Sequence, residues 1–252
     1  MRRVLSLDWD WFTGDCSTLD GCCGWACSFE DNWNRGKTRF SRKVEDGEDD
    51  PEFFPIPEPR IREVLRRLTK IGALVVAECH GSLAALIQEG DEVHHFDAHQ
   101  DDQPYESTNY ESFYQRVNCA NWVTVIQKRH HADVTHVPVG ARARGDGVWT
   151  CQKYVESLTK VYRDPNSPIP EIRDPGIRLA EKAECEILTM HPEYDLVFVC
   201  KSSPWTPPDA DRLLHALVKG LAAKCPTGIR WYGHRAKELR REHARLVEAP
   251  RK

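Results

Sequence analysis

Short apolar segments alternate with amphipathic segments along the chain. The apolar segments are typical of buried strands and cover residues 4–10, 73–77, 92–97, 135–139 and 194–200. Apolar positions at helical spacing predict helices at about residues 60–70, 82–89 and 208–223, whereas residues 121–129 fit either a helix or an extended segment. This alternation predicts an α/β fold, a mostly parallel sheet sandwiched by helices, with ligand sites at the carboxyl ends of the strands.

Residues 13–57 interrupt this alternation and predict a long loop or insertion within one domain that spans residues 1–252. The segment contains an acidic run at 45–52 and a group of closely spaced cysteines. These are Cys16, Cys22, Cys23 and Cys27. Their order, Cys-x5-Cys-Cys-x3-Cys, is not a standard zinc-site spacing, so buried or incidental thiols are the favoured interpretation.

Composition changes this picture little. A chain of 252 residues, 40% hydrophobic and 29% charged, is long enough to bury a sizeable core. The formal net charge of −4 argues against a nucleic-acid or membrane partner, and the basic residues near the C-terminus alternate with glutamates, as on a solvated helix face. Without an apolar stretch typical of a signal peptide or membrane span, we expect a cytoplasmic protein with reduced cysteines. The sequence does not indicate an oligomeric state.

Three polar clusters at the ends of predicted strands carry the candidate chemistry. Their metal-ligand residues are Asp8, Asp10, His80, Asp97, His99 and Asp101. If the strand extends this far, alternation places Asp97, His99 and Asp101 on one face of it, and Asp8 and Asp10 likewise share one face of theirs. Carboxylates that converge at strand ends repel one another unless cations compensate their charge.

The number and type of these ligands predict two divalent ions with bridging carboxylates. Oxygen-rich sites with some imidazole favour manganese over a thiolate-type zinc site, and such an ion pair activates water for hydrolysis. A turn or helix-cap role fits Asp8 and Asp10 taken alone. It fits residues 97–101 less well, because Asp and His form strands poorly and here directly follow an apolar run.

The same segments resemble the motifs of the arginase family. Residues 97–101, Asp-Ala-His-Gln-Asp, resemble the Asp-Ala-His-x-Asp motif of arginases and agmatinases. Residues 78–83 resemble their Gly-Gly-Asp-His-Ser segment, and residues 6–10 resemble their Ser-x-Asp-x-Asp motif. The resemblance implies an arginase-like fold and two Mn²⁺ ions. It assigns one ion to His80, Asp97, Asp101 and Asp8, the other to Asp97, His99, Asp8 and Asp10, and a catalytic role to Asp97, His99 and Asp101.

The chain departs from ordinary arginases in two respects. The Ser-x-Asp-x-Asp strand comes first, as in a divergent branch whose members convert arginine residues of ribosomally made precursor peptides to ornithine and urea. The family's proton-shuttling histidine is missing from residues 118–122. The alternatives for that role are His94, His95, His130 and His131. Of these, His95 is interpreted as a buried neighbour of Asp97, and the last two as surface residues.

A guanidinium substrate also needs a carboxylate partner, because a planar cation with several N–H donors is best held by one. Glu78 is the candidate, since it shares strand alternation with His80, and Glu30, Asp31 and Glu52 of the loop are rivals. The tryptophans near the expected site mouth are more typical of a core than of a substrate platform. They are Trp9, Trp11, Trp25 and Trp33.

The resemblance thus predicts a manganese-dependent hydrolase whose partner is an arginine-containing precursor peptide. Three alternatives remain open at this point. The chain could act on a free small guanidino compound, or it could be a zinc-type deacetylase or other amide hydrolase. It could also be a non-catalytic, metal-stabilised protein that binds a peptide through its acidic loop.

Overall fold

A computed structural model describes most of the predicted strands and helices. The described residues are 1–13, 58–97, 101, 117, 119, 121–137, 143–144, 147–148, 178–179, 184–202, 211–233 and 235–248. The loop expected at 13–57 therefore lies outside them except for its first residue. Among the described helices, none is long and apolar enough to cross a membrane.

The main feature of the fold is a sheet in which every pair of neighbouring strands is parallel. Its strands are β1 (Arg3–Asp8), β2 (Lys70–Ala77), β3 (Glu92–Phe96), β4 (Asp133–Val137), the two-residue β7 (Arg178–Leu179), β8 (Glu193–Cys200) and β9 (Ile229–Tyr232). Their order is β7-β4-β3-β1-β8-β2-β9. The short strands β5 (Ala143–Arg144) and β6 (Gly147–Val148) form a separate antiparallel pair.

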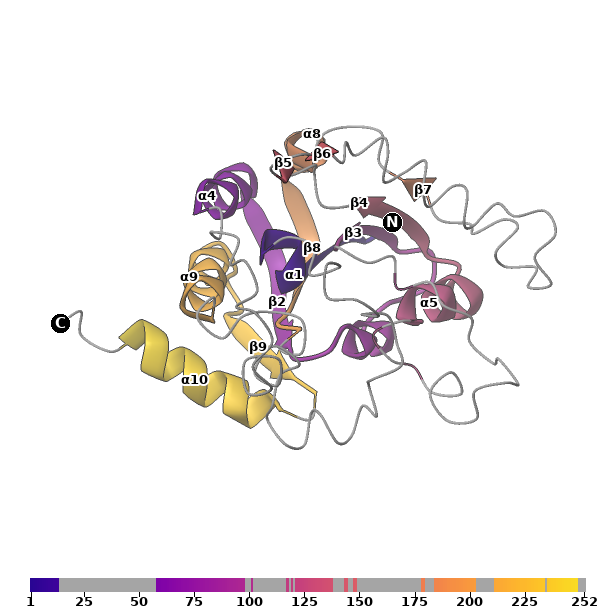
Figure 1. Ribbon diagram of the computed structural model, residues 1–252. Helices are drawn as coiled ribbons and strands as arrows, with labels where there is room; N and C mark the ends of the chain where they lie inside the picture. Colours follow the sequence, from indigo (N-terminus) through magenta and orange to yellow (C-terminus); the bar gives the residue numbers. More distant parts are fainter. Residues whose placement is uncertain are drawn as a thin grey trace, which may run out of the picture.

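Helices cover both faces of this sheet (Figure 1). They are α1 (Trp9–Thr13), α4 (Glu58–Arg67), the 3-10 helix η2 (His80–Ala85), α5 (Trp122–His130), α8 (Glu184–Met190), α9 (Asp211–Ala222) and α10 (Ala236–Glu248). Alternation along β1 shows the two layers: Leu5 and Leu7 pack with α1, α4, α8 and α9, whereas Val4 packs with η2 and α5. The expected α/β class and parallel sheet are thus confirmed.

The strand order makes the end of β1 the point where the connections of the sheet change direction. This strand lies between β3 and β8, and the register pairs Leu7 with Phe96 and Asp8 with Cys200. The chain continues from β1 to β2 on the β8 side, but from β3 to β4 on the other side. Parallel sheets bind ligands where connections diverge in this way, so the ends of β1 and β3 are the expected position of a site.

Several element boundaries differ from the sequence-based expectation. The helix expected at 60–70 is α4, which ends at Arg67, and the helix expected at 82–89 is the 3-10 turn η2. The undecided segment 121–129 is helix α5. Of the basic C-terminal residues, Lys237, Arg240, Arg241 and Arg245 lie exposed on α10, as expected for a solvated helix face, whereas Arg235 precedes the helix and is half-buried.

The strand expected at residues 4–10 ends early, and the prediction that Asp8 and Asp10 share one face of it was wrong. β1 ends at Asp8, and the backbone of Asp10 belongs to helix α1. The helical turn buries three aromatic rings together: the ring centroids of Trp9 and Phe12 are 5.2 Å apart, and those of Trp11 and Phe12 are 4.9 Å apart. A continued strand would send Phe12 to the face opposite the two tryptophans.

Candidate metal centre

Three carboxylates gather around one imidazole nitrogen at the carboxyl edge of the sheet. Nδ1 of His80 lies 2.7 Å from Oδ2 of Asp8 and 3.1 Å from Oδ2 of Asp97. The same nitrogen is 3.5 Å from Oδ2 of Asp101, the most exposed of the four side chains at 11%. These are the four residues that the resemblance assigns to one metal ion, and the fold brings them together from three separate segments.

The ring of His80 is held so that Nδ1 faces the carboxylates. β2 ends at Ala77, and the chain turns into η2, whose first residue is His80. The ring stacks between Trp122 and Phe198, at centroid distances of 5.3 Å and 5.7 Å. Nε2 lies 2.8 Å from Oγ of Ser6, so an Nε2–H that donates to this hydroxyl leaves the lone pair of Nδ1 for the carboxylate side.

The electrostatics of this cluster fit a bound cation. Burial alone would lower the pKa of His80, but the negative charges of Asp8 and Asp97 raise it well above its ordinary value. Among the described residues, Nδ1 of His80 has no hydrogen-bond partner of normal geometry despite the short distances. Two of the three carboxylates, those of Asp8 and Asp97, are buried, and a divalent ion would match both their charge and the nitrogen lone pair.

Neighbouring side chains fix two of the carboxylates. The hydroxyl of Ser202 donates to Oδ2 of Asp8 at 2.6 Å, and the indole N–H of Trp122 donates to Oδ2 of Asp101 at 2.7 Å. Both Asp101 and Ser202 have left-handed backbone conformations, with φ of 56° and 48°. Such conformations are costly outside glycine and concentrate at sites where function over-determines the geometry.

His95 belongs to the same cluster, although the sequence indicated only a buried neighbour of Asp97. Its Nε2 lies 3.4 Å from Oδ2 of Asp97 and 4.0 Å from Oδ2 of Asp101. His80, His95 and Asp97 form one buried group whose ligand atoms lie within 4.8 Å of one another. The signal for His95 was available in strand alternation, because it and Asp97 are two residues apart at the end of β3.

A second buried group combines Asp8 and His80 with Cys200, a residue the sequence analysis did not single out. The register of β1 and β8 pairs Asp8 with Cys200 directly. Burial and the charge of Asp8 raise the pKa of the Cys200 thiol well above its ordinary value. A protonated thiol is a poor ligand for an oxygen-preferring ion, so Cys200 is the weakest ligand candidate of the cluster.

Glu78 is buried, but the argument that placed it in the site does not apply. Its alternation with His80 assumed a continuous strand, and β2 already ends at Ala77. The charge of Glu78 adds to the effects that raise the pKa of Lys201, whose Nζ lies 2.8 Å from the carboxylates of both Asp211 and Glu242. Glu78 is therefore close enough to this network, where β8 meets α9 and α10, for its charge to act on it.

The remaining predicted residues lie partly outside the described part of the chain. His99 lies outside it, as does the side chain of Asp10, so the set assigned to the second ion is described only for Asp8 and Asp97. Also outside are the four clustered cysteines, the alternative guanidinium partners Glu30, Asp31 and Glu52, and the tryptophans Trp25 and Trp33. The described cysteines are free thiols, of which Cys79, Cys200 and Cys225 are buried and Cys119 is half-buried.

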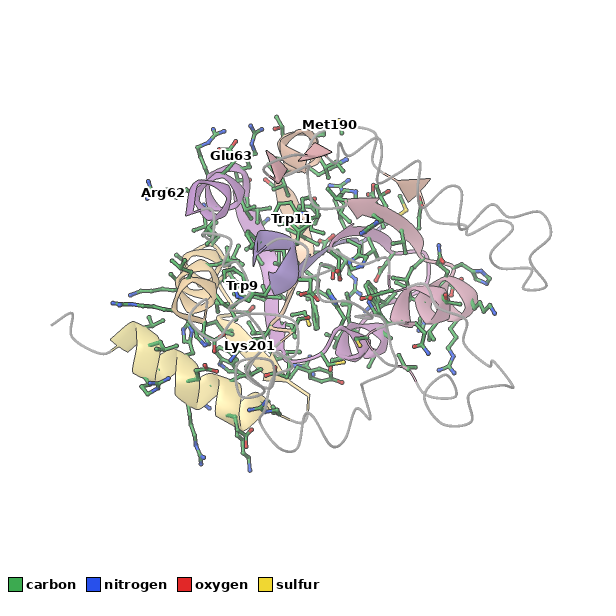
Figure 2. The ribbon with its side chains drawn as sticks, viewed as in Figure 1. Trp9, Trp11, Arg62, Glu63, Met190 and Lys201 are labelled. Atoms are coloured by element: carbon green, nitrogen blue, oxygen red, sulfur yellow. The ribbon has the colours of Figure 1, made fainter. Side chains whose placement is uncertain are left out.

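Trp9 and Trp11 belong to the core, as the sequence analysis favoured. Both are essentially inaccessible to solvent, at 0% and 1%, and Figure 2 shows them on α1 in the interior of the molecule. Of the histidines considered for proton transfer, His131 is exposed and follows the far end of α5. His94 points to the opposite face of β3 from His95, so within the described residues His95 is the one that contacts the carboxylates.

Comparisons of the chain with protein-family models, with curated proteins and with solved structures gave no match. The interpretation of the site rests on its geometry and on the three short motifs.

Proposed function

We propose that the carboxyl edge of the sheet binds two Mn²⁺ ions and that the protein hydrolyses the guanidinium group of arginine residues in a peptide. The observation that carries this proposal is the convergence of three carboxylates, two of them buried, on Nδ1 of His80. A site that only stabilised the fold would not need this concentration of negative charge, which is costly to bury. Sites of this composition are typical of oxygen-preferring divalent ions.

The residue types assigned to each of the two ions fit a metal. Asp8, Asp97, Asp101 and His80 supply carboxylate and imidazole donors to a first ion, and His95 is within reach of the same carboxylates. Asp10 and His99 would complete the second ion's set, as the resemblance implies. Bound there, the ions would lower the pKa of water and stabilise the charge that develops during its attack.

The chain's own residues would set the geometry of this reaction. Ser6 fixes the tautomer of His80, while Ser202 and Trp122 hold the carboxylates of Asp8 and Asp101 in place. Water would add to the guanidinium carbon, the bond from that carbon to the side-chain nitrogen would break, and urea would leave. The nitrogen takes up a proton and becomes the amine of ornithine, and His95 is the described histidine placed to take part in that transfer.

The choice of a peptide over free arginine rests on the family resemblance, and one experiment separates them. The manganese-loaded protein is incubated with an arginine-containing peptide and, in parallel, with free arginine, and both are analysed by mass spectrometry. Loss of one CH₂N₂ unit from the peptide, with free arginine unchanged, supports the proposal. Urea from free arginine alone would make the protein an ordinary ureohydrolase, and no change in either substrate would refute guanidinium hydrolysis.

One observation favours a second candidate function. His80, His95 and Asp97 form a compact group of two imidazoles and one carboxylate, which matches the ligand set of single-zinc hydrolases. A zinc-dependent deacetylase or other amide hydrolase would use this group alone. Metal stoichiometry of the active protein distinguishes the two: two manganese ions per chain support the first proposal, and one zinc ion supports the second.

A further inference from the structure

A second group of possible metal ligands lies at the opposite end of the sheet, away from the candidate metal centre. It consists of Glu92, His94 and His191. Glu92 and His94 lie at the start of β3, and His191 lies in the turn between α8 and β8. His94 was one alternative for proton transfer, but it points away from the carboxyl edge, and the proposed hydrolysis uses none of these three residues. The group therefore needs an explanation of its own.

The three side chains present their ligand atoms to one point. One atom from each lies within 4.8 Å of the others. Nε2 of His94 is 3.4 Å from Oε1 of Glu92, and the ring centroids of His94 and His191 are 5.0 Å apart. A separation of 3.4 Å is at the long end for a hydrogen bond, so any direct bond between His94 and Glu92 is weak.

The surrounding contacts orient each ligand toward that point. Nδ1 of His94 lies 2.7 Å from the hydroxyl oxygen of Tyr194, so an Nδ1–H donated to this oxygen leaves the lone pair of Nε2 facing Glu92. Arg3 donates from Nε to Oε2 of Glu92 at 3.0 Å, which leaves Oε1 on the histidine side. A partner on the other nitrogen or oxygen is the usual arrangement behind metal-binding side chains.

The protonation states suit a cation as well. Burial lowers the pKa of His94 to about 4, so its ring is neutral at pH 7. Burial alone would raise the pKa of Glu92, but the hydrogen bond and charge of Arg3 lower it below its ordinary value, so the carboxylate is ionised. A neutral imidazole and an ionised carboxylate are the forms that bind metal.

We propose that Glu92, His94 and His191 bind one Zn²⁺ ion that fastens the start of β3 to the turn before β8. Two imidazoles and one carboxylate are a known zinc set, with water in the fourth position, and imidazole favours zinc over manganese. The ion joins residues that are far apart in the sequence, so it stabilises the folded chain by binding it and not the unfolded chain. This inference is independent of the reaction at the carboxyl edge.

The test titrates the metal-stripped 252-residue chain with ZnCl₂ alone and counts bound zinc by native mass spectrometry. His191→Asn is the main variant, because it removes one ligand and keeps the contacts of Glu92 with Arg3 and of His94 with Tyr194. The matched control is His131→Asn, an exposed histidine 4.0 Å from a glutamate but without a third ligand among the described residues. Wild type and His131→Asn are expected to bind one zinc more than His191→Asn, and zinc is expected to raise their melting temperatures further.

Two additional variants guard against misfolding of His191→Asn and separate the two metal sites. Glu92→Gln repeats the test with a near-isosteric change, should His191→Asn fail to give the circular dichroism of the metal-free wild type. Asp97→Asn alters only the carboxyl edge, so a double variant with His191→Asn must lose one more zinc than either single variant. Equal zinc counts in wild type, His191→Asn and Glu92→Gln would overturn the proposal, as would a double variant that loses no more than Asp97→Asn.

Discussion

The carboxylates at the two ends of the sheet differ in their contact partners. At the amino end, Asp91 is paired with Arg2 at 2.6 Å and Glu92 with Arg3 at 3.0 Å, so each carboxylate has a guanidinium partner. At the carboxyl end, the contacts described for Asp8 and Asp101 are a hydroxyl, an indole N–H and imidazole. Asp91, which is paired with arginine, stabilises the fold, and Glu92 contacts both an arginine and the imidazole of His94 in the proposed zinc group. The carboxylates around His80 are arranged for a cation that arrives from outside.

The largest effect is expected from Asp97→Asn at the carboxyl edge. Removing a buried carboxylate from the cluster should cost more than about a hundred-fold in activity, because even the hydrogen-bond partners of metal ligands are worth ~10–100-fold. In chelator, the variant should be at least as stable as wild type, since it removes one of several buried like charges. Activity assays and urea unfolding with and without manganese check both effects.

The matched control is Asp133→Asn, an exposed aspartate at the start of β4. It should leave activity, bound manganese and stability close to wild type. Retained activity and retained manganese in Asp97→Asn would remove the central claim of a carboxylate-bound metal at this edge.

A smaller effect is expected from Ser6→Ala, which removes the partner of Nε2 in His80. The ring remains stacked between Trp122 and Phe198, but its tautomer is no longer fixed, so manganese affinity should fall ~10–100-fold while the fold is retained. Equilibrium dialysis against Mn²⁺ measures this loss. Ser82→Ala, a half-buried hydroxyl in η2, is the control, and an equal loss in both variants would show that Ser6 has no specific role.

At the amino end, Arg2→Ala should change stability and leave the metal centre unaffected. It leaves the buried carboxylate of Asp91 without its guanidinium and removes a donor to the carbonyl of Leu86. Because Arg2 is about a quarter exposed, we expect a loss of about 2 kcal/mol, below the range for a fully buried pair. Urea unfolding measures this, with the exposed Arg62→Ala on α4 as a control that should change stability by less than ~0.5 kcal/mol (Figure 2).

Another effect depends on pH and acts through His94. Its pKa in the folded protein is about 4, against an ordinary value of 6.5, so between these values the unfolded chain binds a proton that the folded chain does not. This group's contribution to stability is therefore complete above pH 6.5 and is lost as the pH falls toward 4, at up to ~1.4 kcal/mol per pH unit. Unfolding of metal-free wild type and His94→Gln across this range tests the sign, because the variant should lose less stability on acidification. An identical pH dependence would contradict it.

Much of the site could be predicted because its residues follow strands that are recognisable locally. Apolar runs that end in Asp8 and Asp97 mark strand ends, and the carboxyl ends of parallel strands share one edge of the sheet. His80 was also predictable, since it follows the apolar run of β2. Local pattern therefore determined the α/β class, the edge that carries the carboxylates and most of the residues at it.

Only the tertiary structure decided which side chains lie together at the carboxyl edge and at the amino end of the sheet. The position of β1 between β3 and β8 brings Ser202 to Asp8. The burial of three aromatic rings together favours the helical turn that contains Asp10, so the strand ends before it. At the amino end, Glu92 and His191 are separated by nearly a hundred residues, and each alone looks like an ordinary polar residue. Period-two alternation states which face a side chain takes, but strand order and helix packing, which depend on contacts distant in the sequence, decide its neighbours.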